Sequence, residues 1–272
     1  TLNKIHMAGV NMTNQKRKTL LYKTGVEYGD YTINPYIGCS HGCTYPCYAY
    51  MMAHRFGKAK SITEWEDFKI CENAEALLRN ELKRMHSKIK SVQLCFSTDP
   101  FMYGHDDISN ISIKLIKIIN EYNIPCYILT KGILPKELIQ LNKINFYGIT
   151  YVSNNEDFRK KYECHAAPLK ERLLALKYLS DNGCNTWVSM EPYPTPNIIQ
   201  QDLQSILEDV YFVDKIVFGR LHYNKLVSSF TGYQDFYNEC GETVINYCSK
   251  NKINYHIKKG TIINGMSSNE VK

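Results

Sequence analysis

Several features that would have narrowed the function of this 272-residue sequence are missing. No apolar run approaches the ~20 residues that a membrane-spanning helix needs. The basic residues 16–18 are not followed by the apolar segment of a signal peptide. Linkers, internal repeats and low-complexity tracts are also absent. We therefore expect a cytoplasmic protein with no membrane partner and a single domain over residues 1–272.

A strong charge of either sign is lacking as well. The chain has 33 basic and 27 acidic residues, for a formal net charge of +6. The basic residues are dispersed and do not form the dense stripe with interleaved aromatics that is typical of nucleic-acid enzymes. This balance disfavours a nucleic acid as the partner. The 21 tyrosines either pack in the core with their phenol tips at the surface or offer stacking surfaces to a flat heterocycle.

The sequence does have an alternation of strand and helix patterns. Strands are expected at 31–36, 92–97, 126–130, 145–153, 185–190, 215–219 and 253–257, and helices at 73–90, 111–122, 135–141, 168–181, 198–209 and 234–249. Repeated strand–helix units predict an α/β fold, a parallel sheet with crossover helices on its outside.

Cysteines are scattered singly along the chain except in one place. Cys39, Cys43 and Cys47 fall within the run GCSHGCTYPCYAY, residues 38–50. Three thiolates this close can wrap one soft metal centre, and three ligands leave one iron of a [4Fe–4S] cluster open. A zinc site completed by His41 is the alternative, although no second Cys-x2-Cys pair completes a zinc ribbon. The other cysteines are typical of reduced, buried residues.

This run resembles the cluster loop of the radical S-adenosylmethionine (SAM) superfamily, and Gly-Cys-x-His-Gly-Cys followed by Cys-Tyr-Ala is most similar to the spore photoproduct lyase-like branch. The resemblance implies a [4Fe–4S] cluster on Cys39, Cys43 and Cys47, SAM on the open iron, and reductive cleavage of SAM to a 5′-deoxyadenosyl radical. It also implies an electron donor such as flavodoxin or ferredoxin. It covers about residues 30–260 and implies a partial (β/α)6 TIM-like barrel, with residues 1–30 as an extension over one end.

The loop departs from the family pattern in its spacing. The usual motif is C-x3-C-x2-C, whereas this chain has C-x3-C-x3-C, with one residue, most simply Pro46, added before Cys47. Proline has a restricted φ and no N–H, so the path of the loop must differ. In the usual motif the aromatic residue before the last cysteine packs near the SAM adenine. Here that role is open between Tyr45 and Tyr48.

Polar residues gather at the expected carboxyl ends of the strands, where parallel α/β barrels place their active sites. By resemblance, Thr98 and Asp99 offer oxygen acceptors to the SAM ammonium group. Lys131 and Arg172 are expected to contact the SAM carboxylate. Each also has an ordinary alternative, such as a turn or a surface ion pair. The complete set of expected SAM contacts beyond the tyrosines is Ser97, Thr98, Asp99, Lys131, Ser153 and Arg172.

The later strands end in groups that suit a substrate. Glu191 delivers a carboxylate into the barrel mouth, with a rim salt bridge as its alternative. Further candidates at this edge are Arg220, His222, Tyr223 and Asn224, and the last strand delivers His256, Lys258 and Lys259. We expect a lyase acting on a small molecule, a deazapurine base whose guanidine-like edge faces Glu191 or Asp99, with C–N bond cleavage. DNA or RNA base repair or modification is the alternative. The radical requires a covered mouth, for which residues 1–30 or 100–108 are candidates.

Overall fold

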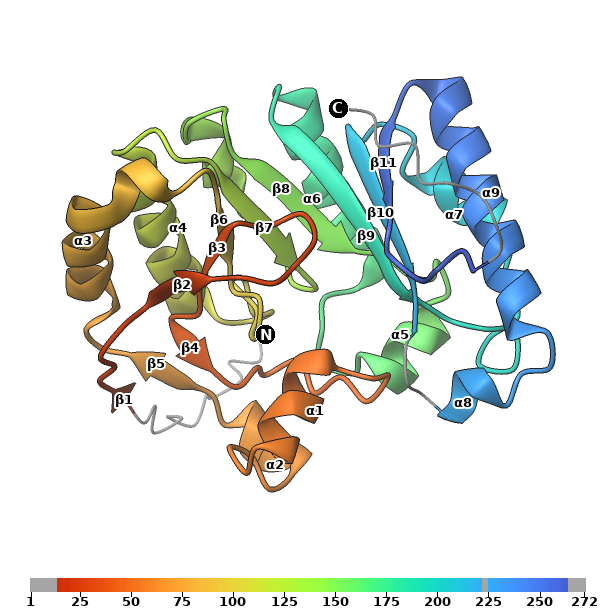
Figure 1. The fold of residues 1–272 in the computed structure, drawn as a ribbon, viewed down its shortest axis with the longest axis horizontal. Helices are drawn as coiled ribbons and strands as arrows, with labels where there is room; N and C mark the ends of the chain where they lie inside the picture. Colours follow the sequence, from red (N-terminus) through yellow and green to blue (C-terminus); the bar gives the residue numbers. More distant parts are fainter. Residues whose placement is uncertain (1–13, 222–224, 264–272) are drawn as a thin grey trace, which may run out of the picture.

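The structure, a computed structural model, describes residues 14–221 and 225–263 (Figure 1). Its main sheet has the strand order β11-β10-β9-β8-β7-β6-β3-β2, and each neighbouring pair is parallel except β2 with β3. The strands are β2 (Leu21–Lys23), β3 (Tyr31–Ile33), β6 (Val92–Leu94), β7 (Cys126–Thr130), β8 (Phe146–Thr150), β9 (Asn185–Tyr193), β10 (Lys215–Arg220) and β11 (Asn254–Ile257). The predicted α/β fold with a mainly parallel sheet is confirmed.

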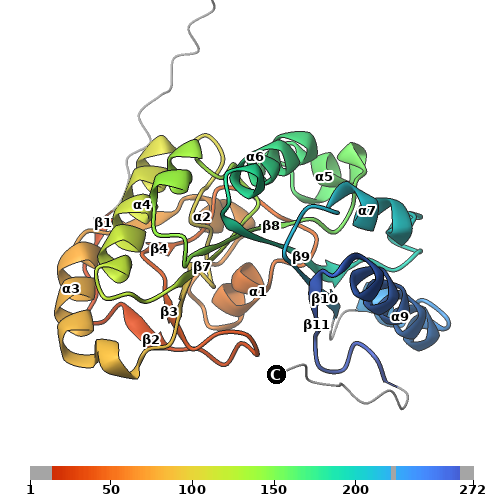
Figure 2. The same cartoon turned by 90° about the horizontal axis from the view of Figure 1, so that it is seen from above.

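Helices pack on the outer face of this curved sheet, as the view in Figure 2 shows. They are α3 (Ala74–Met85), α4 (Asp106–Asn120), α5 (Glu156–Tyr162), α6 (Leu169–Asp181), α7 (Leu203–Asp209) and α9 (Tyr233–Asn251). In α4, Ile108, Leu115 and Ile119 are buried at helical spacing on one face, which joins the core between helix and sheet. Within the described residues no helix has the length and apolar character that crossing a membrane requires.

A second, three-stranded sheet with the order β1-β5-β4 lies below the carboxyl edge of the main sheet in Figure 1. It consists of β1 (Asn14–Gln15), β5 (Lys69–Cys71) and β4 (Tyr36–Ile37), with helices α1 (Tyr48–Arg55) and α2 (Ile62–Glu66) beside it. The expected strand over 31–36 is therefore divided between two sheets. Pro35 stands at the division, and it cannot donate a hydrogen bond to a strand ladder.

Several expected helices differ from the structure: α4 begins before the expected residue 111, and α3 ends before the expected residue 90. The segment expected as a helix over 135–141 is a short 3-10 helix, η2 (Lys136–Gln140). The helix expected from 198 begins only at Leu203, because the Asp202 side chain accepts a hydrogen bond from the Gln204 N–H and caps α7 there.

The loop between β2 and β3 crosses the open side of the barrel. Figure 1 shows this loop, in red, reaching from the edge of the sheet toward β9. Glu27 in the loop accepts hydrogen bonds from His256 and from the Lys259 N–H, at the opposite edge strand. Residues 14–30 of the expected extension thus include edge strand β2 and this crossing loop, while residues 1–13 lie outside the described part of the chain.

Candidate active site

The three cysteines lie on the loop that joins β4 to α1, at the carboxyl ends of the parallel strands (Figure 1). Gly38 opens the loop with a φ of +94°, and a Cβ there would lie 2.4 Å from the Trp65 carbonyl oxygen. Only glycine permits this turn. Cys39 N–H donates to the same carbonyl at 2.9 Å. At the other end, Cys47 caps α1, and its Sγ accepts from the Tyr50 N–H at 3.5 Å. Both ends of the loop are therefore anchored by the backbone.

The thiols of this loop are partly or fully buried and lie close to one another. Burial raises the pKa of Cys39 and of Cys43, and neighbouring thiolate charge adds to the effect. Lys131 opposes it, because its Nζ lies 3.8 Å from Cys43 Sγ and favours the thiolate. Three neighbouring thiols with the Lys131 ammonium beside one of them suit an iron–sulfur cluster, which takes thiolate ligands. In the described ranges, no three His, Cys, Asp or Glu side chains are arranged to hold a single metal ion.

His41, the fourth ligand of the alternative zinc site, is occupied by protein partners. Its Nε2 accepts from the Tyr103 N–H at 2.9 Å, and its Nδ1 lies 3.5 Å from Asp99 Oδ2. Burial lowers the pKa of His41 to about 4, so the ring is neutral near pH 7. Both ring nitrogens are committed, so His41 fastens the cysteine loop to its neighbours and the structure does not support the zinc alternative.

Protein groups contact both carboxylate oxygens of Asp99. Its carboxylate accepts hydrogen bonds from the Phe101 N–H at 2.9 Å, the Thr130 hydroxyl at 2.6 Å and the Lys131 N–H at 2.9 Å, besides its contact with His41. A carboxylate offers about four lone-pair positions, and protein groups use all of them. Asp99 therefore ties together the loops around the site, and its expected contact with the SAM ammonium group or a substrate edge stays a prediction.

Thr98 and Ser97 stand at the end of β6, beside the cysteine loop. The Thr98 hydroxyl donates to the Gly38 carbonyl, and its oxygen keeps a lone pair for a cation. Ser97 N–H donates to Asn34 Oδ1 at 2.7 Å, and both Ser97 and Thr98 are half-buried. Their proposed contact with SAM stays a prediction.

Glu163 joins Lys131 to Arg172 in a buried triad. Lys131 Nζ lies 2.8 Å from Glu163 Oε1, and Arg172 Nη2 lies 2.8 Å from Glu163 Oε2. Burial alone would raise the pKa of Glu163, but the two cations outweigh it and lower that pKa to about 2. The charges of Cys43 and Glu163 likewise outweigh burial and raise the pKa of Lys131. Glu163 and Lys131 are therefore charged at neutral pH, and a guanidinium stays protonated in proteins.

Arg172 is fully buried and is held by protein groups. The side chain is 0% exposed, and it also donates to the carbonyls of Ala167 and Thr150. The guanidinium is enclosed by protein in this structure, and the expected contact between Arg172 and the SAM carboxylate stays a prediction. Glu163 was not among the expected site residues. The sequence signal for Glu163 was its place just before Ala167, Pro168 and Arg172. The role of Glu163 became clear only from its contacts with Lys131 and Arg172 in the folded chain.

The two candidate tyrosines face different environments. Tyr45 is 2% exposed, and its ring lies edge-on to Phe158 at 5.4 Å and to Tyr162 at 5.8 Å. Tyr48 is 59% exposed and lies 6.0 Å from the ring of Phe96. Tyr48 is thus the one accessible to a flat ligand. Ser153 is also buried, and its Oγ accepts from the Asn155 N–H at the start of α5.

Of the residues expected to bind substrate, the structure describes Glu191 and Arg220. Glu191 Oε1 lies 2.8 Å from Lys258 Nζ, so the rim salt bridge forms, while both side chains stay 22% exposed. Arg220 is half-buried at the end of β10, and its N–H donates to the Thr261 hydroxyl. The remaining three, His222, Tyr223 and Asn224, lie outside the described residues.

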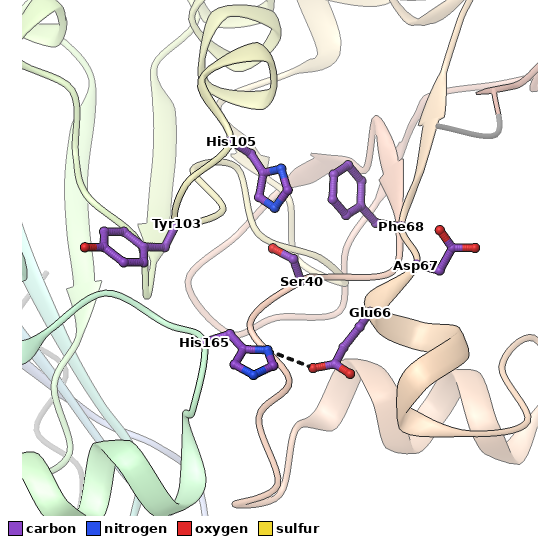
Figure 3. A pocket seen from close by; sticks show the side chains of 7 residues that line it. All are labelled: Ser40, Glu66, Asp67, Phe68, Tyr103, His105 and His165. Carbon is purple, nitrogen blue, oxygen red and sulfur yellow. Dashed lines mark ion pairs between the residues drawn. The ribbon is translucent and has the colours of Figure 1, made fainter. Parts of the chain in front are cut away.

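A surface pocket of about 390 Å³ lies on the outer side of the cysteine loop. Figure 3 shows its side chains, including an ion pair between His165 Nδ1 and Glu66 Oε1 at 3.1 Å. Its lining is Ser40, Glu66, Asp67, Phe68, Tyr103, His105 and His165. None of the residues expected to contact SAM or substrate is among them. The pocket is therefore separate from the groups at the strand ends.

Comparison with known proteins gives partial sequence relatives and, separately, solved structures of similar fold. Uncharacterized proteins of Mycobacterium bovis and Mycobacterium tuberculosis are 32% identical over 105 residues, 38% of this chain and 30% of theirs, so the match spans less than a third of their length. Spore photoproduct lyase complexed with dinucleoside spore photoproduct aligns with a TM-score of 0.66 at 13% identity, over 90% of this chain and 81% of that one. Streptococcus suis SuiB bound to S-adenosylmethionine aligns with a TM-score of 0.55 at 16% identity, over 84% and 46%. These likenesses show the fold.

The family itself is shown by a sequence match to the radical SAM superfamily over residues 33–210, well over half of the chain. That range contains the three-cysteine loop and the Lys131–Glu163–Arg172 triad. Members of this family use a [4Fe–4S] cluster and SAM, to which the thiol donors of the loop are suited. The chain belongs to the radical SAM superfamily.

Proposed function

We propose that this protein is a radical SAM lyase that breaks a C–N bond in a small deazapurine. Its first candidate substrate is queuine, which would yield 7-aminomethyl-7-deazaguanine. The observation that carries the radical chemistry is the loop of Cys39, Cys43 and Cys47 with the Lys131 ammonium 3.8 Å from Cys43 Sγ. When bound, the cluster and SAM supply a 5′-deoxyadenosyl radical that abstracts hydrogen from the substrate. An electron donor such as flavodoxin or ferredoxin would supply the electron that reductive cleavage of SAM requires.

The residues around the loop suit the two ends of SAM. Lys131 is held at the barrel mouth with its side chain 19% exposed, so its ammonium remains accessible to a carboxylate. The free lone pair of Thr98 suits an ammonium group. The exposed ring of Tyr48 beside Phe96 suits an adenine face. Each of these side chains comes from a different segment, and Asp99 and His41 hold the segments together.

The substrate region lies deeper in the barrel, on the side of β9 to β11. Since protein donors use the lone pairs of Asp99, Glu191 is the carboxylate available to a guanidine-like edge. The crossing loop with Glu27 covers the open side of the barrel and suits the exclusion of water that radical chemistry needs. A cyclopentenediol placed next to the radical would lose hydrogen near its C–N bond, which weakens that bond.

A nucleic-acid substrate is the second candidate. The fold is similar to that of spore photoproduct lyase, whose solved complex contains a dinucleoside spore photoproduct. Against it stands the mild net charge of +6, because proteins that grip a phosphate backbone rely on many clustered cations. Binding to oligonucleotides that falls steeply with added salt would favour this candidate.

The test is anaerobic turnover of the iron–sulfur-reconstituted protein with SAM, dithionite and queuine, followed by mass spectrometry. We expect 5′-deoxyadenosine and 7-aminomethyl-7-deazaguanine together. Both products should be lost in Cys43→Ala and retained in Cys164→Ala, a matched variant of an exposed cysteine close to the loop. If 5′-deoxyadenosine forms slowly and queuine is unchanged, the substrate is wrong while the SAM chemistry stands.

A further inference from the structure

The Glu191–Lys258 ion pair lies on the inner face of the sheet. Side chains alternate along a strand, and Val188 and Met190 of β9 are buried in the core shared with the helices. Glu191 therefore points to the opposite face, into the barrel. A Cβ on Gly219 of the neighbouring strand would lie 3.0 Å from Glu191 Cγ and 3.3 Å from Lys258 Cβ. Glycine at position 219 thus leaves the space in which the two charged side chains meet.

Tyr28 of the crossing loop lies beside this pair and gives it an aromatic wall. Its ring is edge-on to Trp187 at 5.9 Å and to His256 at 5.8 Å, and Lys258 Nζ lies 6.0 Å from its centroid. Trp187 is 2% exposed, and its indole Nε1 has no hydrogen-bond partner among the residues that the structure describes. The loop keeps this position through Glu27, whose Oε2 lies 2.9 Å from His256 Nε2.

Within residues 14–221 and 225–263, the pair has unused hydrogen-bonding capacity. A carboxylate offers about four acceptor positions and an ammonium three donors, while the contact between Glu191 and Lys258 uses one of each. We propose that Glu191 and Lys258 read the hydrogen-bonding edge of a guanine-type ring against the wall formed by Tyr28. Glu191 takes the ring N–H and the exocyclic amine, and Lys258 donates to the adjacent carbonyl. This deepens the proposed function and rests on it.

The same arrangement discriminates between the two substrate classes. A guanine-type edge presents two adjacent donors and then an acceptor, which is complementary to a carboxylate next to an ammonium. A pyrimidine of the thymine type presents one donor between two acceptors, and it leaves half of the carboxylate unmatched. Leaving an oxygen of this partly buried carboxylate without a hydrogen bond lowers the binding affinity. The pair therefore favours a deazaguanine over a thymine-type photoproduct.

Equilibrium dialysis of the cluster-reconstituted protein with SAM, without reductant, tests this by binding alone. The probes are 7-deazaguanine and 7-deazahypoxanthine, which lacks the exocyclic amine, together with a thymidine dinucleotide. We expect the native protein to prefer 7-deazaguanine by about tenfold, since a two-bond contact supplies that order of discrimination. The preference should fall to about twofold or less in Glu191→Gln. It should persist in Glu239→Gln, an exposed glutamate on α9.

The variant Lys258→Met tests the other half of the ion pair in the same binding experiment. Both deazapurines carry the carbonyl, so this variant should weaken the binding of both and keep the tenfold ratio. Because the readout is a ratio, partial loss of folded protein does not change it. A ratio unaffected by Glu191→Gln overturns the inference even if queuine is turned over. Preferential binding of the thymidine dinucleotide overturns both the inference and the deazapurine substrate. If SAM is cleaved on reduction while neither deazapurine binds, the inference and the deazapurine substrate are both overturned, and the assignment as a radical SAM enzyme stands.

Discussion

Lys131 and Glu163 form a buried ion pair, with Lys131 Nζ 2.8 Å from Glu163 Oε1 and the carboxylate only 2% exposed. Arg172 contacts the other carboxylate oxygen, so the triad holds two positive charges and one negative charge. The surplus positive charge faces the cysteine loop, where Lys131 contacts Cys43. Thiolate ligands and the carboxylate of SAM are the anions that such a surplus favours. The triad therefore contributes to the stability of the fold and also places positive charge beside the cysteine loop.

Replacing Glu163 should destabilise the protein strongly. Glu163→Gln leaves the buried Arg172 and the partly exposed Lys131 without a counter-charge, and breaking a buried pair in this way costs about 3–5 kcal/mol. The measurement is the free energy of unfolding of the cluster-free protein in a denaturant series. Glu75→Gln is the matched control, because Glu75 also lies between two cations, Arg79 and Lys114, but is 40% exposed. Its effect should stay below about 1 kcal/mol. Equal losses in the two variants would contradict the structural role of the triad.

Stability should also depend on pH through Glu163. Its pKa in the folded chain is lowered to about 2, below the value of about 4.3 expected in an unfolded chain. The contribution is therefore complete above the unfolded pKa and is lost as the pH falls toward 2. It amounts to something on the order of 3 kcal/mol. Unfolding curves of the native protein and of Glu163→Gln, measured between pH 6 and 3, should converge as the pH falls. A constant gap between them would show that the carboxylate does not titrate as described.

Lys131 should affect SAM binding more than folding. Lys131→Met removes the cation beside Cys43 and leaves Glu163 paired with Arg172. We expect SAM affinity to fall about 10- to 100-fold, the range of a lost charge-assisted hydrogen bond. The reduction potential of the cluster should become more negative, because less positive charge stabilises the added electron. Equilibrium dialysis and a redox titration followed by electron paramagnetic resonance measure the two effects. Lys136→Met, an exposed lysine, is the control, and an equal effect there would refute the assignment.

Replacing Tyr45 should affect the stability of the fold, whereas replacing Tyr48 should affect SAM binding. Tyr45→Ala removes a ring packed against Phe158 and Tyr162 and should cost about 3–5 kcal/mol of unfolding free energy. Tyr48→Ala removes an exposed ring and should leave stability within about 0.5 kcal/mol. Its SAM affinity should nevertheless fall several-fold through lost stacking on adenine. Thermal unfolding together with SAM binding decides the question, and unchanged SAM affinity in Tyr48→Ala would assign the adenine contact elsewhere.

The sequence by itself determined the fold class and the metal-binding loop. Strand and helix patterns arise from local burial along the chain, so the alternation was enough to predict a parallel sheet with outer helices. Cys39, Cys43 and Cys47 are likewise local, because three thiols on one short loop must converge wherever the loop lies. Lys131 could be placed near them since the carboxyl ends of parallel strands share one edge.

The tertiary structure decided which polar groups have partners and which stay available. Asp99 and Arg172 matched family positions in the sequence, yet their hydrogen bonds come from segments distant in the chain and enclose them. Glu27 contacts His256 at the opposite end of the sequence, a contact that no local pattern encodes. Availability to a ligand depends on the three-dimensional surroundings of a side chain, and this is why the supporting residues of the site became visible only in the folded chain.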